Sequence, residues 1–340
     1  MRVFVSGATG FAGSHTVAAL LEAGHLPRLL VRDPAKAVRV LAALGVDAGR
    51  VELAAGDMLD EEAVGAALEG CRAAIHAAAA VGVARGAGDL MEINVTGTRN
   101  VVGGAVARGL DPVVHVSTVA VFVPPRGPVI TADDPLGAPR NAYGRSKVAA
   151  ERYVRGLQDR GAPITIVYPG GLLGPHQPVL DSLMAGLAAA LRLVWPLPRG
   201  GVSVLDVRDL ATALTRCLVP GRGPRRWMLG GRHLTWRRYA DLCEETAGAR
   251  VRRLPVPGPA LLAAGAVLDA VKRIRPFDHP LTRDAAEIMI RLAPTDDRPA
   301  LDALGIELRP IEETLVDALR WLVDAGHLDA ERVPLVRSGR

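Results

Sequence analysis

A tyrosine and a lysine stand four residues apart in "NAYGRSKVAAE", the segment that covers residues 141–151. On a helix, Tyr143 and Lys147 share one face, so the ammonium lies beside the phenol or beside a ligand that the phenol contacts. The pKa of a free tyrosine is about 10, and a neighbouring cation favours the phenolate. The pair therefore predicts a phenol that exchanges protons with a substrate near neutral pH.

The type of cation supports this interpretation. The chain contains 41 Lys and Arg residues, and only Lys36, Lys147 and Lys272 are lysines. A chain that otherwise uses arginine has a lysine four residues after Tyr143, which indicates that a compact ammonium is needed there. The spacing alone also fits a surface tyrosine beside a solvated lysine.

Three glycines near the N-terminus indicate a phosphate-binding turn. Gly7, Gly10 and Gly13 lie in "GATGFAG", directly after the apolar run "RVFVS". A strand, a glycine-rich turn and a helix form the element at which a dinucleotide-binding fold holds a pyrophosphate. The turn lacks the Gly-Lys-Ser/Thr ending of a nucleoside-triphosphate loop, which argues against a kinase or an ATPase. Without a ligand, the same residues would form only a tight turn.

A hydroxyl is expected near the same place. The apolar run in "VVHVSTVAVF", residues 113–122, ends in Ser117 and Thr118. In a doubly wound sheet, ligands bind beyond the carboxyl ends of the strands, so Thr118 is expected to bind a substrate oxygen. Taken alone, Thr118 fits equally well as a cap at the end of a strand.

The elements that must position these residues follow from the periodicity. Short apolar runs alternate with longer Ala- and Leu-rich stretches, as in βαβ units with a parallel sheet. Strands are expected at 2–6, 28–31, 51–55, 73–77, 112–117 and 164–168, and helices at 12–23, 34–44, 60–69, 87–109 and 142–160. This order predicts an α/β fold, a Rossmann-type doubly wound parallel sheet.

The expected domain division follows the same pattern. Residues 1–168 form the dinucleotide-binding domain, to which 202–220 return through a strand at "VSVLDV" (202–207). Residues 169–201 and 221–340, which are rich in Pro and Gly clusters, form a smaller and mostly helical substrate-binding region.

Composition limits the remaining classes. The chain of 340 residues is 49% hydrophobic, and its three cysteines are widely spaced, so neither a disulfide framework nor a metal site is expected. No secretory signal is recognised, so a cytoplasmic location is expected. The net charge of +5 is scattered, which argues against nucleic acid.

The apolar runs of the sequence also indicate how the chain could meet a membrane. The apolar runs are shorter than the roughly 20 residues of a membrane span, so stable insertion is not expected. The run 259–271, followed by basic residues at 272, 273 and 275, leaves a peripheral membrane contact open.

Together these motifs resemble the extended short-chain dehydrogenase/reductases, the NAD(P)-dependent epimerase/dehydratase type. Within that family the chain is most similar to the dihydroflavonol-reductase and 3β-hydroxysteroid-dehydrogenase-like branch. The further motifs, in family order, are "GDMLD" (56–60), "IHAAA" (75–79), "NVTGTRNVV" (94–102), "YPGGLLGP" (168–175) and "VLDVRDLATAL" (204–214).

The resemblance implies roles for individual residues. Tyr143 would be the general acid/base, Lys147 would hold the nicotinamide ribose and tune Tyr143, and Thr118 would orient the substrate oxygen. The cofactor would contact Gly7, Thr9, Gly10, Phe11, Ala12, Gly13, Arg32, Asp57, Met58, Ala77, Ala78, Ala79, Tyr143, Lys147, Tyr168, Pro169 and Gly170. The chain departs from the family in having Thr118 where Ser is common, and Tyr168-Pro169-Gly170 where an Arg-Pro-Gly motif is usual.

The end of the second strand, "RLLVRDP", bears on the cofactor. A fold that selects NAD has a carboxylate there for the ribose 2′-OH, whereas this chain has Val31 followed by Arg32. The guanidinium of Arg32 suits a 2′-phosphate, so NADP(H) is expected in preference to NAD(H), which remains the alternative. Asp33 precedes Pro34 and is expected to cap the next helix.

The expected activity is hydride transfer between NADP and a carbonyl or secondary alcohol of an apolar small molecule. The apolar segment 183–198 is expected to line the substrate pocket. One alternative is a sugar-nucleotide epimerase or dehydratase, in which Arg226, Arg232, Arg237 and Arg238 would bind a diphosphate. Another is a non-catalytic dinucleotide sensor. A homodimer is left open.

Overall fold

Seven parallel strands form the central sheet of the computed structural model, which describes residues 1–80, 90–139, 142–274 and 281–337. The strand order is β10-β6-β5-β4-β1-β2-β3. The strands are β1 (Arg2–Ser6), β2 (Leu26–Val31), β3 (Glu52–Ala55), β4 (Ala73–His76), β5 (Val113–Val116), β6 (Ile164–Pro169) and β10 (Arg225–Leu229). The order reverses between β1 and β4, where doubly wound sheets bind their ligands. The expected fold class is confirmed.

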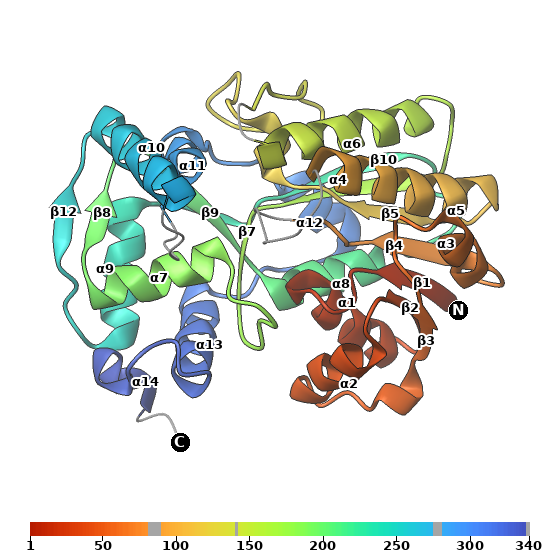
Figure 1. Cartoon of the computed structure of the whole chain (residues 1–340), viewed down its shortest axis with the longest axis horizontal. Helices are drawn as coiled ribbons and strands as arrows, with labels where there is room; N and C mark the ends of the chain where they lie inside the picture. The colour runs from red at the N-terminus through yellow and green to blue at the C-terminus, as the bar shows by residue number, and fades with distance from the viewer. Residues whose placement is uncertain (81–89, 140–141, 275–280, 338–340) are drawn as a thin grey trace.

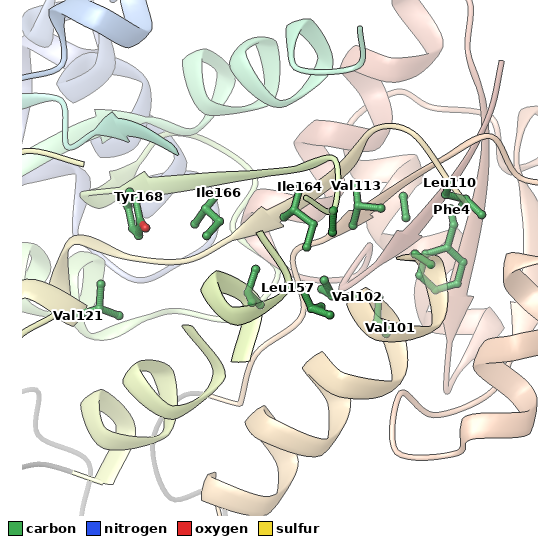
Figure 2. Packing of buried hydrophobic residues seen from close by; sticks show 14 of the residues in the cluster. Phe4, Val101, Val102, Leu110, Val113, Val121, Leu157, Ile164, Ile166 and Tyr168 are labelled. Carbon is green, nitrogen blue, oxygen red and sulfur yellow. The ribbon is translucent and has the colours of Figure 1, made fainter. Parts of the chain in front are cut away.

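Helices cover both faces of this sheet (Figure 1). One face carries α3 (Glu61–Leu68), α4 (Leu90–Thr98), α5 (Gly104–Ala107) and α6 (Ala142–Gln158). The other carries α1 (Phe11–Glu22), α2 (Pro34–Ala43), α8 (Val207–Arg216) and α12 (Arg298–Leu304). Because successive side chains of a strand point to opposite faces, Phe4 joins the first layer while Val3 and Val5 join the second. Figure 2 shows Phe4 packed near Val101 and Leu110.

The helix expected at 87–109 is interrupted. Its described part runs from Leu90 to Ala107 and contains a π-helix at Arg99–Gly103, while residues 87–89 lie outside the described residues. Gly97 faces the Met58 side chain, and Gly103 faces the Tyr153 hydroxyl. Glycine has a low helix propensity, and a π-bulge is a common way for a helix to accommodate a local irregularity.

The C-terminal part contains helices and two small sheets. One sheet has the order β11-β9-β7, and the other pairs β12 with β8. These strands are β7 (Gly171–Leu173), β8 (Trp195–Leu197), β9 (Gly201–Asp206), β11 (Arg232–Thr235) and β12 (Arg253–Pro255). The helices are α7 (Ser182–Arg192), α9 (Trp236–Ala247), α10 (Gly258–Ile274), α11 (Arg283–Arg291), α13 (Ile311–Asp324) and α14 (Pro334–Arg337). Their shared core includes Trp195 packed edge-on against Tyr239.

The expectation that a strand at 202–207 joins the large sheet is wrong. This segment forms β9, which pairs with β7 and β11. The edge of β6 is occupied by β10, which lies within the region expected to bind substrate. A Cβ on Gly170 would overlap the carbonyl oxygen of Gly230, so the ends of β6 and β10 are packed too closely to admit another strand. Within residues 202–220 it is α8, which follows β9, that packs against α1 of the large domain.

The helices were compared with the length and composition of a membrane-spanning helix. In the part of the chain that the structure describes, none of them has both the length and the apolar composition that a bilayer crossing requires. The basic residues at 272, 273 and 275 were considered for a peripheral membrane contact, and their side chains lie outside the described part of the structure.

Candidate active site

At two of the three N-terminal glycines, the backbone lies so close to another part of the chain that a side chain would not fit. Gly7 has a φ of +81°, and a Cβ there would lie 2.6 Å from the backbone of Ala77 and Ala78. A Cβ on Gly13 would overlap the carbonyl oxygen of Gly7. The turn after β1 therefore lies directly against the segment after β4, at the point where the strand order reverses.

The third glycine leaves the start of α1 open. Gly10 is exposed, and a Cβ there would meet only the oxygen of Gly7, at 3.2 Å. Among the described residues no side chain caps this helix, and its first turn has no acidic residue. The positive end of α1 is therefore accessible, and it fits the pyrophosphate of a dinucleotide. Thr9, Phe11 and Ala12 are half-buried around it.

Several expected cofactor contacts lie around this turn. The N–H of Ala77 donates to the oxygen of Ser6, and Ala79 is exposed. Asp57 follows β3, and its carboxylate accepts from the N–H of Leu59. The oxygen of Met58 accepts from Asn100 at 3.0 Å.

Arg32 extends into solvent at the end of β2. Its side chain is 81% exposed and lies 3.6 Å from the Asp57 carboxylate. The carboxylate of Asp33 accepts from the N–H of Lys36 at 2.9 Å and caps α2, as expected. Asp33, the acidic residue next to Arg32 in the sequence, therefore binds the N-terminus of α2.

Tyr143 and Lys147 lie on α6, as the spacing predicts. Lys147 is buried, and its Nζ donates to the oxygen of Val116 at 3.2 Å. Burial lowers the pKa of Lys147 to about 8, although Glu151 opposes this shift. Burial raises the pKa of Tyr143 to about 12, which is opposite to the expected effect of an adjacent cation. Desolvation thus outweighs any stabilisation of the phenolate by Lys147.

The structure shows the capping role of Thr118, one of the two roles that the sequence left open. Its Oγ1 accepts from the N–H of Ala120 at 3.2 Å and caps the short 3-10 helix Val119–Phe122. Since the oxygen is the acceptor in this bond, the hydroxyl proton remains available for a ligand. The 3-10 helix packs against α6, which brings Thr118 toward the region of Tyr143.

Tyr143 borders a small cavity. The other residues that line it are Ala120, Val123, Pro124, Pro139, Glu287 and Ile288. The last two belong to α11, and sequence analysis did not identify them. The segment 183–198, which was expected to line the pocket, supplies none of the lining residues, because α7 packs into the C-terminal core through Met184, Leu187 and Leu191.

Tyr168 occupies the position where the family usually has an arginine, and another arginine, Arg155 of α6, binds its hydroxyl. Tyr168 is fully buried, and its hydroxyl accepts from Arg155 Nη2 at 2.9 Å. Arg155 Nε also donates to Glu151, four residues earlier on α6. The Tyr168 side chain therefore points into the core, as Figure 2 shows, and only its backbone remains for a cofactor. Pro169 is buried, and Gly170 is enclosed by backbone oxygens of Ser203 and Gly230.

Sequence analysis also missed Asn94. Its side-chain amide accepts from the N–H of Ala80 at 2.7 Å and donates to the oxygen of Ala80. It donates as well to Ser146 on α6, whose hydroxyl donates to the oxygen of Tyr143. Asn94 thus ties the segment after β4 to α6, the helix that carries Tyr143 and Lys147. In the sequence, its position as the first residue of the motif "NVTGTRNVV" was the signal that could have identified it.

Two neutral histidines lie in the core near Lys147. His76 is hydrogen-bonded to Ser6 at 2.7 Å and to Thr98 at 3.1 Å, and its ring stacks on that of His115. Burial lowers the pKa of His76 to about 3. Burial also lowers the pKa of His115 well below its usual value, and the charge of Lys147 adds to both shifts. The Lys147 ammonium therefore has uncharged neighbours on this side.

The fold and these side chains define a Rossmann-type enzyme with a tyrosine–lysine pair at the dinucleotide crevice. The family comparison is more specific, because residues 3–230 match the NAD dependent epimerase/dehydratase family. The chain belongs to that family, which confirms the expected resemblance. In the broad sense it is an NAD(P)-dependent oxidoreductase.

Full-length similarity supports this assignment. The chain is 31% identical over 338 residues to sterol demethylase protein B of Methylococcus capsulatus, covering 96% of this chain and 99% of that protein. It is 26% identical over 335 residues to the 4-hydroxy-2-methyl-3-oxo-4-farnesyl-3,4-dihydroquinoline-1-oxide ketoreductase of Stigmatella aurantiaca, covering 96% and 98%. The crystal structure of gox2253 is similar, with a TM-score of 0.76, 26% identity, and coverage of 96% of this chain and 99% of that one.

Proposed function

We propose that the protein is an NADP-dependent oxidoreductase that acts on a carbonyl or secondary alcohol of a largely apolar small molecule. The observation that carries the proposal is the cavity beside Tyr143, where five of the six other lining residues are Ala, Val, Pro or Ile. Apolar walls with few polar groups suit a hydrophobic ligand whose reacting oxygen meets the phenol.

The residues divide the chemistry between them. When bound, the nicotinamide supplies or accepts the hydride. In reduction, Tyr143 gives its proton to the carbonyl oxygen, and its pKa of about 12 keeps the phenol protonated beforehand. Thr118 donates a hydrogen bond to the same oxygen. The Lys147 ammonium binds the ribose and stabilises the phenolate that remains, and oxidation reverses the proton transfer.

The exposed end of β2 supports the choice of NADP. Arg32 is free to turn toward a 2′-phosphate, since its ion pair with Asp57 is long and solvated. Asp33 caps α2 instead of facing a ribose 2′-hydroxyl. A phosphate at this position would gain a charge-assisted hydrogen bond, while an unphosphorylated ribose would not.

The epimerase alternative is less well supported, because three of its candidate arginines already have protein partners. Arg232 donates to the oxygen of Leu308, Arg238 pairs with Glu245, and Arg226 lies 3.8 Å from Asp133. The four arginines are also divided among β10, β11 and α9. Two relatives, a sterol demethylase protein and a ketoreductase of a farnesylated ring, favour lipophilic carbonyl substrates for this chain as well.

Absorbance of the reduced cofactor tests the proposal. The purified protein is incubated with NADPH or NADH and a panel of aryl, alicyclic and steroid ketones, and with UDP-glucose as the epimerase probe. Consumption of NADPH with an apolar ketone is the expected result. Conversion of UDP-glucose, followed by chromatography, without net consumption of NADPH would favour the epimerase. Cofactor binding without any turnover would favour a sensor.

A further inference from the structure

A single carboxylate interrupts the apolar lining of the Tyr143 cavity. Glu287 lines this cavity together with Ile288, the next residue on α11. Its side chain is only 17% exposed. A half-buried carboxylate on a surface that is otherwise apolar is costly unless its oxygens accept hydrogen bonds, so its presence calls for a partner.

The protein supplies that partner only in part. The polar contact of Glu287 within the described residues is an ion pair of 3.4 Å between its Oε1 and Nε of Arg291, one turn later on α11. The Arg291 side chain is 48% exposed, so the pair is partly solvated and weak. A carboxylate accepts about four hydrogen bonds, which leaves capacity on the side that faces the cavity.

The position of α11 is fixed by contacts with both halves of the molecule. The indole N–H of Trp236 donates to the oxygen of Met289 at 2.8 Å. Beyond the helix, Ile130 exchanges backbone hydrogen bonds with Pro294 and Asp296. Glu287 is thus held beside Tyr143 by rigid elements, as a residue that selects a substrate must be.

We propose that Glu287 selects the substrate of the Tyr143 site. The preferred substrate is an apolar carbonyl compound that carries an uncharged hydrogen-bond donor, a hydroxyl or an N–H group, directed at this carboxylate. The nearby Arg291 reduces the need for a cationic partner, and an anionic group at this position is repelled. The inference rests on the proposed function, because it assigns the substrate class of the same site.

The apolar walls further limit the class. The cavity has room for about one water-sized group, and in it Glu287 is one acceptor among Ala120, Val123, Pro124, Pro139 and Ile288. Unpaired hydroxyls against these walls would lose their hydrogen bonds to water without compensation. A compound with one well-placed donor on a hydrophobic body fits the lining better.

Binding and turnover of matched aryl ketones test the inference. The probes are acetophenone, its 2′-, 3′- and 4′-hydroxy derivatives, and 3- and 4-acetylbenzoate, titrated by calorimetry into protein saturated with NADP⁺. The variants are Glu287→Ala and Glu287→Gln. Arg291→Gln is the matched control, because it removes the same ion pair but keeps the carboxylate. Turnover of each probe with NADPH is measured separately.

The expected wild-type result is that at least one hydroxy derivative binds about tenfold or more tightly than acetophenone, the range of a hydrogen bond to a charged group. Glu287→Ala should remove this preference, Arg291→Gln should retain it, and Glu287→Gln should improve binding of an acetylbenzoate. An unchanged preference in Glu287→Ala, or no preferred hydroxy derivative in the wild type, would overturn the inference. Preferential binding without turnover would instead support the inference and count against the proposed reductase activity.

Discussion

The hydroxyl of Tyr168 donates a hydrogen bond of 2.5 Å to Oε1 of Glu151, a buried residue of α6. Tyr143, Lys147, Glu151 and Arg155 follow one another at intervals of four residues, so they lie along one face of α6. Glu151 raises the pKa of Lys147 against the effect of burial. Tyr168 and Arg155 therefore hold the carboxylate that helps keep Lys147 charged.

Removal of the Tyr168 hydroxyl should destabilise the protein. Tyr168→Phe keeps the ring packing against Phe122 but deprives buried Glu151 of a donor. We expect the free energy of unfolding, measured with urea, to fall by about 1–3 kcal/mol. The control is Tyr153→Phe on the same helix, where the tyrosine is half-buried and its hydroxyl lies beside Gly103, and an equal loss in both variants would contradict the special role of Tyr168.

Loss of the catalytic phenol should impair turnover and spare cofactor binding. For Tyr143→Phe we expect kcat to fall by about 10²- to 10⁴-fold, the usual contribution of general acid catalysis. The dissociation constant of NADPH, measured by fluorescence titration, should stay within about twofold, since the glycine turn is untouched. Near-normal turnover in this variant would rule out Tyr143 as the proton donor.

Burial of Lys147 should give stability a specific pH dependence. Its folded pKa of about 8 lies below the ordinary value of 10.5, so the unfolded chain holds this proton more tightly. Stability therefore rises as pH increases from about 8 toward 10, because the unfavourable buried charge is lost. Compared with Lys147→Met, the wild type should gain unfolding free energy between pH 7 and pH 10 in urea titrations. A difference between the two proteins that does not change with pH would contradict the shift.

The same group predicts a pH limit for activity. In the proposed function the charged ammonium is the form that binds the ribose and stabilises the phenolate, so we expect kcat/KM for ketone reduction to fall above about pH 8. Lys147→Arg should not restore a normal profile, because a planar guanidinium does not fit the buried site at the Val116 oxygen. A flat profile to pH 10 in the wild type would argue against this role.

Arg32 should control the preference between cofactors. We expect the wild type to favour NADPH over NADH by about tenfold or more in kcat/KM, the effect of one charged hydrogen bond. Arg32→Ala should remove most of this preference by weakening NADPH. The matched control is Arg39→Ala, since Arg39 is also exposed and lies 3.9 Å from Asp33. A preference that survives in Arg32→Ala would show that another group reads the ribose.

Much of the large domain was predictable because its signals are local. Apolar runs gave β1 to β6 to within two residues, and the capping role of Asp33 followed from the Asp-Pro pair. β10 was missed because Arg225 and Arg226 precede its apolar residues and resemble a solvated segment. Their long side chains are half-buried at the sheet edge, where the aliphatic stems cover apolar surface.

The site was predictable only where its residues are close in sequence. Tyr143 and Lys147 are one helical turn apart, so spacing was enough. Glu287 lies more than a hundred residues from Tyr143 along the chain, and no local pattern relates the two. The replacement of a strand arginine by Arg155 was likewise hidden, because it depends on α6 lying over the end of β6.

The main-chain bridge between Ile130 and Thr295 has a consequence for the diversification of this enzyme. It joins the segment that follows Ala120 and Val123 to the one that follows α11, and so links the two walls of the cavity. We expect new substrate ranges to arise by exchange of side chains on this frame. A library at Ala120, Val123 and Ile288 would alter the size of accepted ketones one methyl group at a time, while the frame retains its stability.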